Sequence, residues 1–116
     1  MSAVTIYHNP RCSKSRNTLA LLEKSGIHPE VVLYLENPPN RKELEQLLKK
    51  LGLTAAELVR RTEEAYKACG LNKGSTGEEI VGAMVKYPKL IERPIVVKGD
   101  RAVLGRPPEN VLELIK

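Results

Sequence analysis

The stretch Ala3-Val-Thr-Ile-Tyr7 opens the pattern that decides the fold. It is short, β-branched and aromatic, and it runs into Asn9-Pro10, so it predicts a first strand that ends in a loop. Apolar residues at helical spacing follow until Gly26, a residue type that favours the end of a helix. A second strand-like run, Val31-Val-Leu-Tyr-Leu35, comes next. Strand, helix and strand in this order predict a right-handed parallel βαβ unit.

The middle of the chain, residues 54 to 86, holds only helical patterns. Capping residues followed three positions later by glutamate predict helix starts at Asn40 with Glu43, Thr54 with Glu57, and Thr76 with Glu79. Of these helices, the first is expected to end at Gly52 and to bury Leu44, Leu47, Leu48 and Leu51. The last is expected to bury Ile80, Met84 and Val85. We interpret residues 54 to 86 as a helical insertion.

The end of the chain predicts a hairpin and a helix. Ile95-Val-Val97 and Ala102-Val-Leu104 flank Lys98-Gly-Asp-Arg101, whose glycine and aspartate suit a tight turn. A helix is expected from Pro108 to Ile115. The order βαβ, helical insertion, ββα predicts an α/β fold with a small mixed four-stranded sheet, in one domain over residues 1–116.

Composition limits the classes of function. No apolar run approaches the roughly 20 residues of a membrane span, and no secretory signal opens the chain, so we expect a cytoplasmic protein without a membrane segment. Phe and Trp are absent, which leaves little for base stacking, and we expect no nucleic-acid partner. The net charge of +5 favours an anionic partner. A monomer is the expected state.

Cys12 stands where the first helix is expected to begin, within His8-Asn-Pro-Arg-Cys-Ser-Lys-Ser-Arg16. Free backbone N–H groups and the helix dipole favour a thiolate at such a position. Further positive charge is expected from Arg11, Lys14 and Arg16. These cationic residues and the polar side chains beside them argue against a buried structural cysteine, so we predict that Cys12 is a nucleophile.

Polar neighbours can support the thiolate further. The hydroxyl groups of Ser13 and Ser15 can donate hydrogen bonds to the sulfur, and His8, if protonated, would lower the pKa of Cys12. The other cysteine, Cys69, lacks a comparable charge cluster in the sequence, and we interpret it as a bystander.

Several rival chemistries fail on spacing. Cys12 and Arg16 are too close for a tyrosine-phosphatase loop, in which the two residues are farther apart. The two Cys and two His match no zinc spacing, so no metal is expected. The chain has no CxxC pair, and its cysteines cannot build a disulfide framework.

Several motifs closely resemble the glutaredoxin-dependent arsenate reductases. The amino-terminal signature is His8-Asn-Pro-x-Cys12-x-x-Ser15-Arg16, followed by Asn17-Thr-Leu19. The resemblance continues in order through Leu33–Pro39, Leu58-Val-Arg60, Pro88–Val97 and Gly105-Arg-Pro107. Members of that family have a thioredoxin-like fold with a helical insertion, and they use one catalytic cysteine and no metal.

The resemblance implies specific roles. Cys12, supported by His8 and Ser15, would attack arsenate, and the resulting oxyanion adduct would be bound by Arg60, Arg93 and Arg106. A cis peptide bond at Pro94 would aim Arg93 at the site. Glutathione would act as co-substrate and glutaredoxin as reductant, without a bound cofactor, and the product would be arsenite.

Two other functions remain open on the sequence. The first is a monothiol oxidoreductase that acts on glutathionylated substrates through Cys12. The second is a non-enzymatic regulator like the Spx-type transcription factors, although Ser15 stands where many of these carry a second cysteine. The chain also departs from well-established reductases at Ser13-Lys14, where they often have Gly-Thr, and it lacks their longer carboxy-terminal tail. The resemblance therefore indicates the fold more firmly than the substrate.

Overall fold

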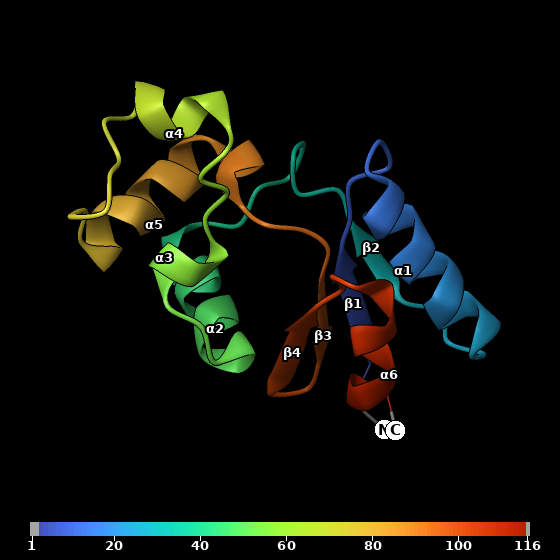
Figure 1. The fold of residues 1–116 in the computed structure, drawn as a ribbon. Helices are drawn as coiled ribbons and strands as arrows, with labels where there is room; N and C mark the ends of the chain where they lie inside the picture. Colours follow the sequence, from blue (N-terminus) through green and yellow to red (C-terminus); the bar gives the residue numbers. More distant parts are fainter. Residues whose placement is uncertain (1–2, 116) are drawn as a thin grey trace. The chain divides into compact units, whose positions relative to one another are not determined.

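A computed structural model describes residues 3–115 of the chain, and these residues form two compact units (Figure 1). We call residues 3–37 with 93–115 the sheet unit, and Pro38–Glu92 the helical unit. The interpretation of the chain as one functional domain stays a prediction.

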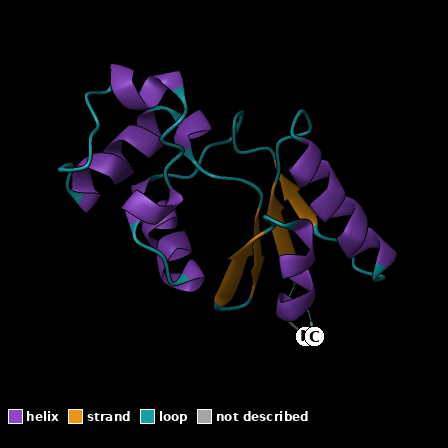
Figure 2. Ribbon diagram, viewed as in Figure 1, coloured by secondary structure: helices purple, strands orange, loops and turns teal. Residues whose placement is uncertain are grey.

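The sheet unit contains all the named strands of the described residues (Figure 2). Its elements are β1 (Val4–Tyr7), α1 (Ser13–Lys24), β2 (Glu30–Val32), β3 (Ile95–Lys98), β4 (Arg101–Leu104), the 3₁₀ helix η2 (Pro108–Asn110) and α6 (Val111–Leu114). The strand order is β2-β1-β3-β4, with β1 parallel to β2 and antiparallel to β3. The predicted mixed four-stranded sheet and the βαβ and ββα halves are confirmed.

One face of this sheet packs against α1 and α6. Alternation along β1 turns Val4 and Ile6 to this face, where they meet Val96 of β3. Leu22 of α1 closes the core from the helix side, together with Val111 and Leu114 of α6. Full burial of each such side chain stabilises the fold by about 1.5–3 kcal/mol. The core therefore fixes α1, the helix that Cys12 precedes, against the sheet.

Two elements differ from the sequence prediction. The run Val31–Leu35 was expected to be one strand, but β2 stops at Val32 because β1, its only partner in the sheet, ends at Tyr7. The chain then turns, since the amides of Glu36 and Asn37 both donate to the Leu33 carbonyl. The final helix is also divided, because η2 precedes a short α6 where one continuous helix was predicted.

The helical unit follows the predicted capping signals. It comprises α2 (Arg41–Leu51), α3 (Ala55–Leu58), α4 (Glu64–Ala68), α5 (Gly77–Lys86) and the 3₁₀ helix η1 (Pro88–Leu90). All three expected capping boxes form, at Asn40, Thr54 and Thr76. The buried stripes differ in detail: Leu51 is only half-buried, and α5 buries Val81 where Val85 was predicted.

Candidate active site

Cys12 is the N-cap residue of α1, as predicted. Its backbone is extended, with φ −96° and ψ 123°, and its carbonyl accepts the Arg16 amide at 3.0 Å, the first bond of the helix. The Cys12 amide donates to the Asn9 carbonyl at 3.0 Å and closes a tight turn before the helix. This geometry holds a half-buried thiol beside the free N–H groups of the first helical turn.

Opposing effects act on the Cys12 thiol. Burial by itself raises the pKa of Cys12, but hydrogen bonds from the Ser15 and Lys14 amides and the nearby Arg93 guanidinium outweigh it. The net result is a lowered pKa. Cys12 therefore ionises more readily than an ordinary cysteine, and the thiolate is the reactive form.

Ser15 supports the sulfur in a different way from the one predicted. Its hydroxyl was expected to donate to Cys12, but its Oγ lies 2.7 Å from His8 Nδ1 and accepts the Asn9 amide at 3.0 Å. Ser15 is fully buried, so this contact fixes the loop from within. The group of Ser15 that favours the thiolate is its backbone N–H.

His8 acts on the loop rather than directly on the sulfur. Its side chain is buried, and burial together with the charge of Arg16 lowers its pKa. The neutral form is thereby favoured, and His8 is absent from the groups that shift the pKa of Cys12. We expected that His8, if protonated, would lower the pKa of Cys12. In the structure the neutral form of His8 is favoured, and its ring contacts Ser15.

The positive charge at the thiol comes from a distant part of the sequence. Arg11, Lys14 and Arg16 were expected to supply it, but Arg93 is the cation that acts on the pKa of Cys12. Arg16 instead donates to the Pro10 carbonyl at 2.9 Å and braces the loop.

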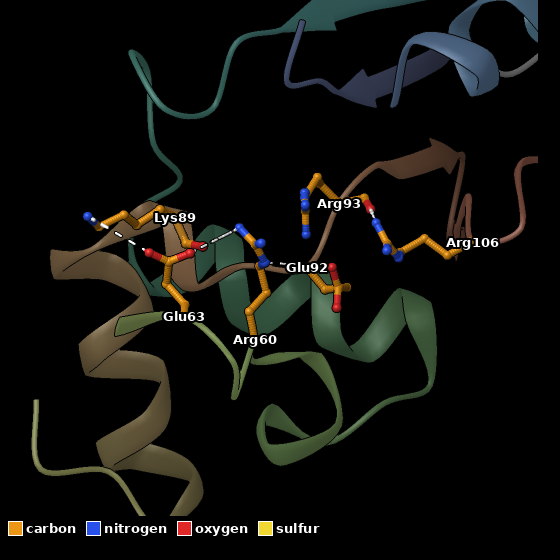
Figure 3. A network of polar contacts seen from close by, with 6 residues as sticks. All are labelled: Arg60, Glu63, Lys89, Glu92, Arg93 and Arg106. Atoms are coloured by element: carbon orange, nitrogen blue, oxygen red, sulfur yellow. Dashed lines mark hydrogen bonds and ion pairs between the residues drawn. The ribbon is translucent and has the colours of Figure 1, made fainter. Parts of the chain in front are cut away.

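Arg93 and Arg106 each precede a proline, and both peptide bonds are cis. The bond before Pro94 was predicted; the one before Pro107 was not. Arg106 Nη1 donates to the Arg93 carbonyl at 3.3 Å (Figure 3), and the Gly105 amide donates to the Pro94 carbonyl at 2.9 Å. The sheet unit thus brings Cys12 and Arg93 together, and it joins Arg106 to Arg93.

Thr18 and Gly105 complete this arrangement, and neither was predicted from the sequence as a site-forming residue. Thr18 is fully buried, and its hydroxyl lies 2.7 Å from the Lys14 carbonyl and 3.3 Å from the Gly105 carbonyl. A Cβ at Gly105 would lie 2.8 Å from Cγ of Pro94 and would also collide with Thr18. The Gly105-Arg-Pro107 motif was a signal, but the contact with α1 joins residues 87 positions apart.

Arg60 belongs to the helical unit and contacts carboxylates there. Its Nη1 lies 3.5 Å from Glu63 and donates to the Lys89 carbonyl at 3.2 Å, while its Nε is 4.0 Å from Glu92 (Figure 3). The neighbouring Arg61 donates to the Ala56 carbonyl at 3.3 Å. The role of Arg60 as an oxyanion ligand stays a prediction.

Residues 3–115 lack two features that would indicate other classes of function. No helix in this range combines the length and apolar character that crossing a bilayer requires. Within the same range, no group of three or more His, Cys, Asp or Glu side chains is arranged to hold a metal ion.

Similar proteins define the class to which this fold and loop belong. Residues 7–114 match the model of the ArsC family, and the chain belongs to that family. It is 56% identical to the uncharacterized protein YfgD of Escherichia coli K12, over 97% of this chain and 96% of that protein. An arsenate reductase of Haemophilus influenzae is 48% identical, over 97% and 99% of the two chains.

A solved structure gives the same result for the fold. The arsenate reductase from Vibrio cholerae superposes with a TM-score of 0.92 at 51% identity, covering 97% of each chain. The expected thioredoxin-like architecture of the family is confirmed.

Proposed function

We propose that this chain is an arsenate reductase that converts arsenate to arsenite through a covalent adduct on Cys12. The observation that carries the proposal is the position of Cys12 at the start of α1, where two backbone amides and the Arg93 guanidinium lower the pKa of its thiol. Cationic and N–H donors of this kind suit a tetrahedral oxyanion. The ArsC family and its curated arsenate reductases support this choice of substrate.

The first half of the reaction uses no change of oxidation state. The Cys12 thiolate attacks arsenic(V), a S–As bond forms, and one arsenate oxygen leaves as water after protonation. Arg93 would stabilise the oxygen charge, because a planar guanidinium matches two oxygens at once. We assign Arg106 and Arg60 to the same oxyanion, while His8 and Ser15 hold the loop in shape.

The second half reduces arsenic with two external thiols. Glutathione displaces a second water from arsenic and leaves a mixed Cys12–arsenic–glutathione adduct. A glutaredoxin thiolate then attacks the glutathione sulfur, and the electron pair of the arsenic–sulfur bond reduces arsenic(V) to arsenic(III). Water finally releases arsenite and regenerates the Cys12 thiol. The products also include glutaredoxin–glutathione disulfide, so the electrons balance.

This chemistry needs no prosthetic group in our proposal, because both electrons come from thiols. A reducing compartment keeps such thiols available, so we assign the reaction to the cytoplasm. We further propose that the chain works as a monomer, with arsenate, glutathione and glutaredoxin as its only partners in the reaction.

A coupled assay tests the proposed function. Purified protein, glutathione, glutaredoxin and glutathione reductase should oxidise NADPH only when arsenate is added. Cys12→Ser should abolish this rate, because the nucleophile is lost. Cys69→Ser is the matched control and should keep the rate within about twofold, since Cys69 takes no part in the proposed reaction.

The same preparation separates the proposal from a monothiol oxidoreductase, which the single reactive thiol also suits. That activity would reduce a glutathionylated substrate through Cys12 at a rate that arsenate does not change. An absence of arsenate-dependent turnover at millimolar arsenate would reject the reductase assignment.

A further inference from the structure

A groove lies at the carboxyl ends of β1 and β2, beside the loop that carries Cys12. It has a volume of about 270 Å³ and lies wholly within the sheet unit. One wall is formed by residues 8–11, which follow β1, and the other by Leu33, Leu35 and Glu36, which follow β2. In open α/β sheets, ligands bind outside the carboxyl ends of parallel strands. We call this feature the strand-end groove.

Both walls are held in place by hydrogen bonds. The His8 amide donates to the Val32 carbonyl at 2.9 Å and ties the two strand ends together. Asn9 accepts the Arg11 amide through Oδ1 at 3.0 Å, which fixes the first wall as a turn. The Leu33 carbonyl accepts two amides from the second wall. The groove is therefore formed before any ligand arrives, which lowers the entropic cost of binding.

The lining combines apolar surface with two opposite charges. Leu35 is 46% exposed and supplies apolar surface to the lining. Arg11, whose side chain is cationic, lies on one wall, and Glu36, whose side chain is anionic, lies on the other. These groups suit a small zwitterionic ligand that has an ammonium, a carboxylate and an apolar or peptide body.

The groove also borders the chain segment that leads into Cys12. Arg11 precedes Cys12 directly, and consecutive Cα atoms are about 3.8 Å apart. A ligand seated between Arg11 and Glu36 would thus present its reactive group close to whatever is bonded to Cys12. A volume of about 270 Å³ suits a small peptide rather than a folded protein.

We propose that the strand-end groove is the binding site for glutathione, with Glu36 holding its ammonium group and Arg11 one of its carboxylates. This inference rests on the proposed function, in which glutathione is the first thiol to attack the adduct. Bound there, the glutathione thiol forms a sulfur–arsenic bond on the Cys12 adduct. A hydroxyl group leaves arsenic as water, taking the thiol proton, and arsenic stays at oxidation state five.

The first arm of the test is steady-state kinetics of the full chain with Arg11→Gln and Glu36→Gln. Each variant should raise the KM for glutathione about fivefold, the scale of one partly shielded ion pair, and leave the KM for arsenate unchanged. The matched controls are Lys24→Gln and Glu23→Gln, which remove exposed charges of the same signs near the far end of α1. They should leave both KM values unchanged.

The second arm needs no arsenate. Oxidised glutathione converts the Cys12 thiolate to a Cys12–glutathione disulfide and releases one reduced glutathione, a step that mass spectrometry follows directly. The rate should saturate with oxidised glutathione and fall about fivefold in both groove variants. Hydroxyethyl disulfide, a neutral compound, measures the intrinsic reactivity of Cys12, and its rate should not change in Glu36→Gln.

The two arms distinguish a failure of the proposed function from a failure of the proposed glutathione site. If the wild-type chain shows no arsenate-dependent turnover, the proposed function fails, and the disulfide arm still decides the groove. If KM for glutathione and the disulfide rate are both unchanged in Arg11→Gln and Glu36→Gln, the groove is not the glutathione site. An equal loss with the neutral disulfide would also overturn it, because the variants would then act on the thiol itself.

Discussion

The two cysteines of this chain stand at opposite ends of helices. Cys12 is the N-cap of α1, and Cys69 is the C-cap of α4. Both are free and half-buried, so exposure does not distinguish them. What differs is the backbone around them: N–H groups surround the start of a helix, and carbonyl groups surround its end. The first of these environments favours a sulfur anion.

The comparison also shows that a helix start is only part of the site. Two amides of α1 act on Cys12, but the cation comes from Arg93, in the loop that precedes β3 in the sheet unit. The amides follow from the position of Cys12 in the sequence, whereas Arg93 arrives only when β3 pairs with β1. The reactivity of Cys12 thus depends on tertiary structure as well as on the local helix.

Removing the charge of Arg93 should have the largest effect on the difference between Cys12 and Cys69. We expect Arg93→Gln to lower kcat/KM for arsenate about 100-fold, the cost of losing one donor to a developing oxyanion. It should also raise the pKa of Cys12, because a stabilising charge is lost. Arg101→Gln, an exposed arginine of β4, is the control and should behave like the wild type. Activity that survives in Arg93→Gln would exclude Arg93 from the site.

Competitive alkylation of both thiols in one sample should measure the difference in reactivity between Cys12 and Cys69. At pH 7 we expect iodoacetamide to modify Cys12 about tenfold faster than Cys69, because the lowered pKa of Cys12 supplies more thiolate. The rate at Cys12 should therefore level off at a lower pH than that of a cysteine in an unfolded peptide. Peptide mass spectrometry reads both sites at once, and equal rates would contradict the assigned nucleophile.

The same pKa has a consequence for stability with a definite sign. An acid whose pKa falls on folding stabilises the folded state above its unfolded pKa, and this contribution disappears as the pH drops through the folded pKa. The free energy of unfolding of the wild type, relative to Cys12→Ser, should thus increase as the pH rises from the folded pKa of Cys12 toward about 8.5. Denaturant melts at several pH values would show an opposite trend if the Cys12 pKa were raised.

Local signals in the sequence predicted the frame of the site but not its contacts. The strand, the turn at Asn9-Pro10 and the helix start placed Cys12 correctly, since each depends on neighbouring residues. The hydroxyl of Ser15 was assigned to the wrong partner because its actual partner, His8, is positioned by the end of β1. The extent of β2 was overestimated because strand length depends on the partner strand.

Contacts between distant segments lay beyond sequence reasoning unless a family motif pointed to them. Arg93 and Arg106 were named through the family resemblance, and the structure links them through one backbone carbonyl. Thr18 carried no such signal. A threonine within a helical pattern looks like any other helical position, and its contact with Gly105 exists only in the folded sheet unit.

Substitution of Thr18 should have the smallest and most specific effect on the difference between Cys12 and Cys69. Its hydroxyl joins the Lys14 carbonyl of α1 to the Gly105 carbonyl, and Gly105 bonds to Pro94, the residue after Arg93. Thr18→Val keeps the shape and loses the hydroxyl, so we expect about 1 kcal/mol of destabilisation. The alkylation rate of Cys12 should fall about threefold at pH 7, because Arg93 loses its fixed position. This change corresponds to a rise of roughly 0.5 in the pKa of Cys12.

Thr18→Ser keeps the hydroxyl and should restore the alkylation rate of Cys12, even though loss of a buried methyl lowers stability. A purely structural role predicts instead that the serine variant reacts no faster than the valine variant. Cys69, read in the same sample, should not respond to either change, and Thr62→Val in the helical unit should leave both thiols unaffected. If Thr18→Ser restores reactivity without restoring stability, the Thr18 hydroxyl positions Arg93 against the thiolate. The start of the helix alone cannot provide this positioning.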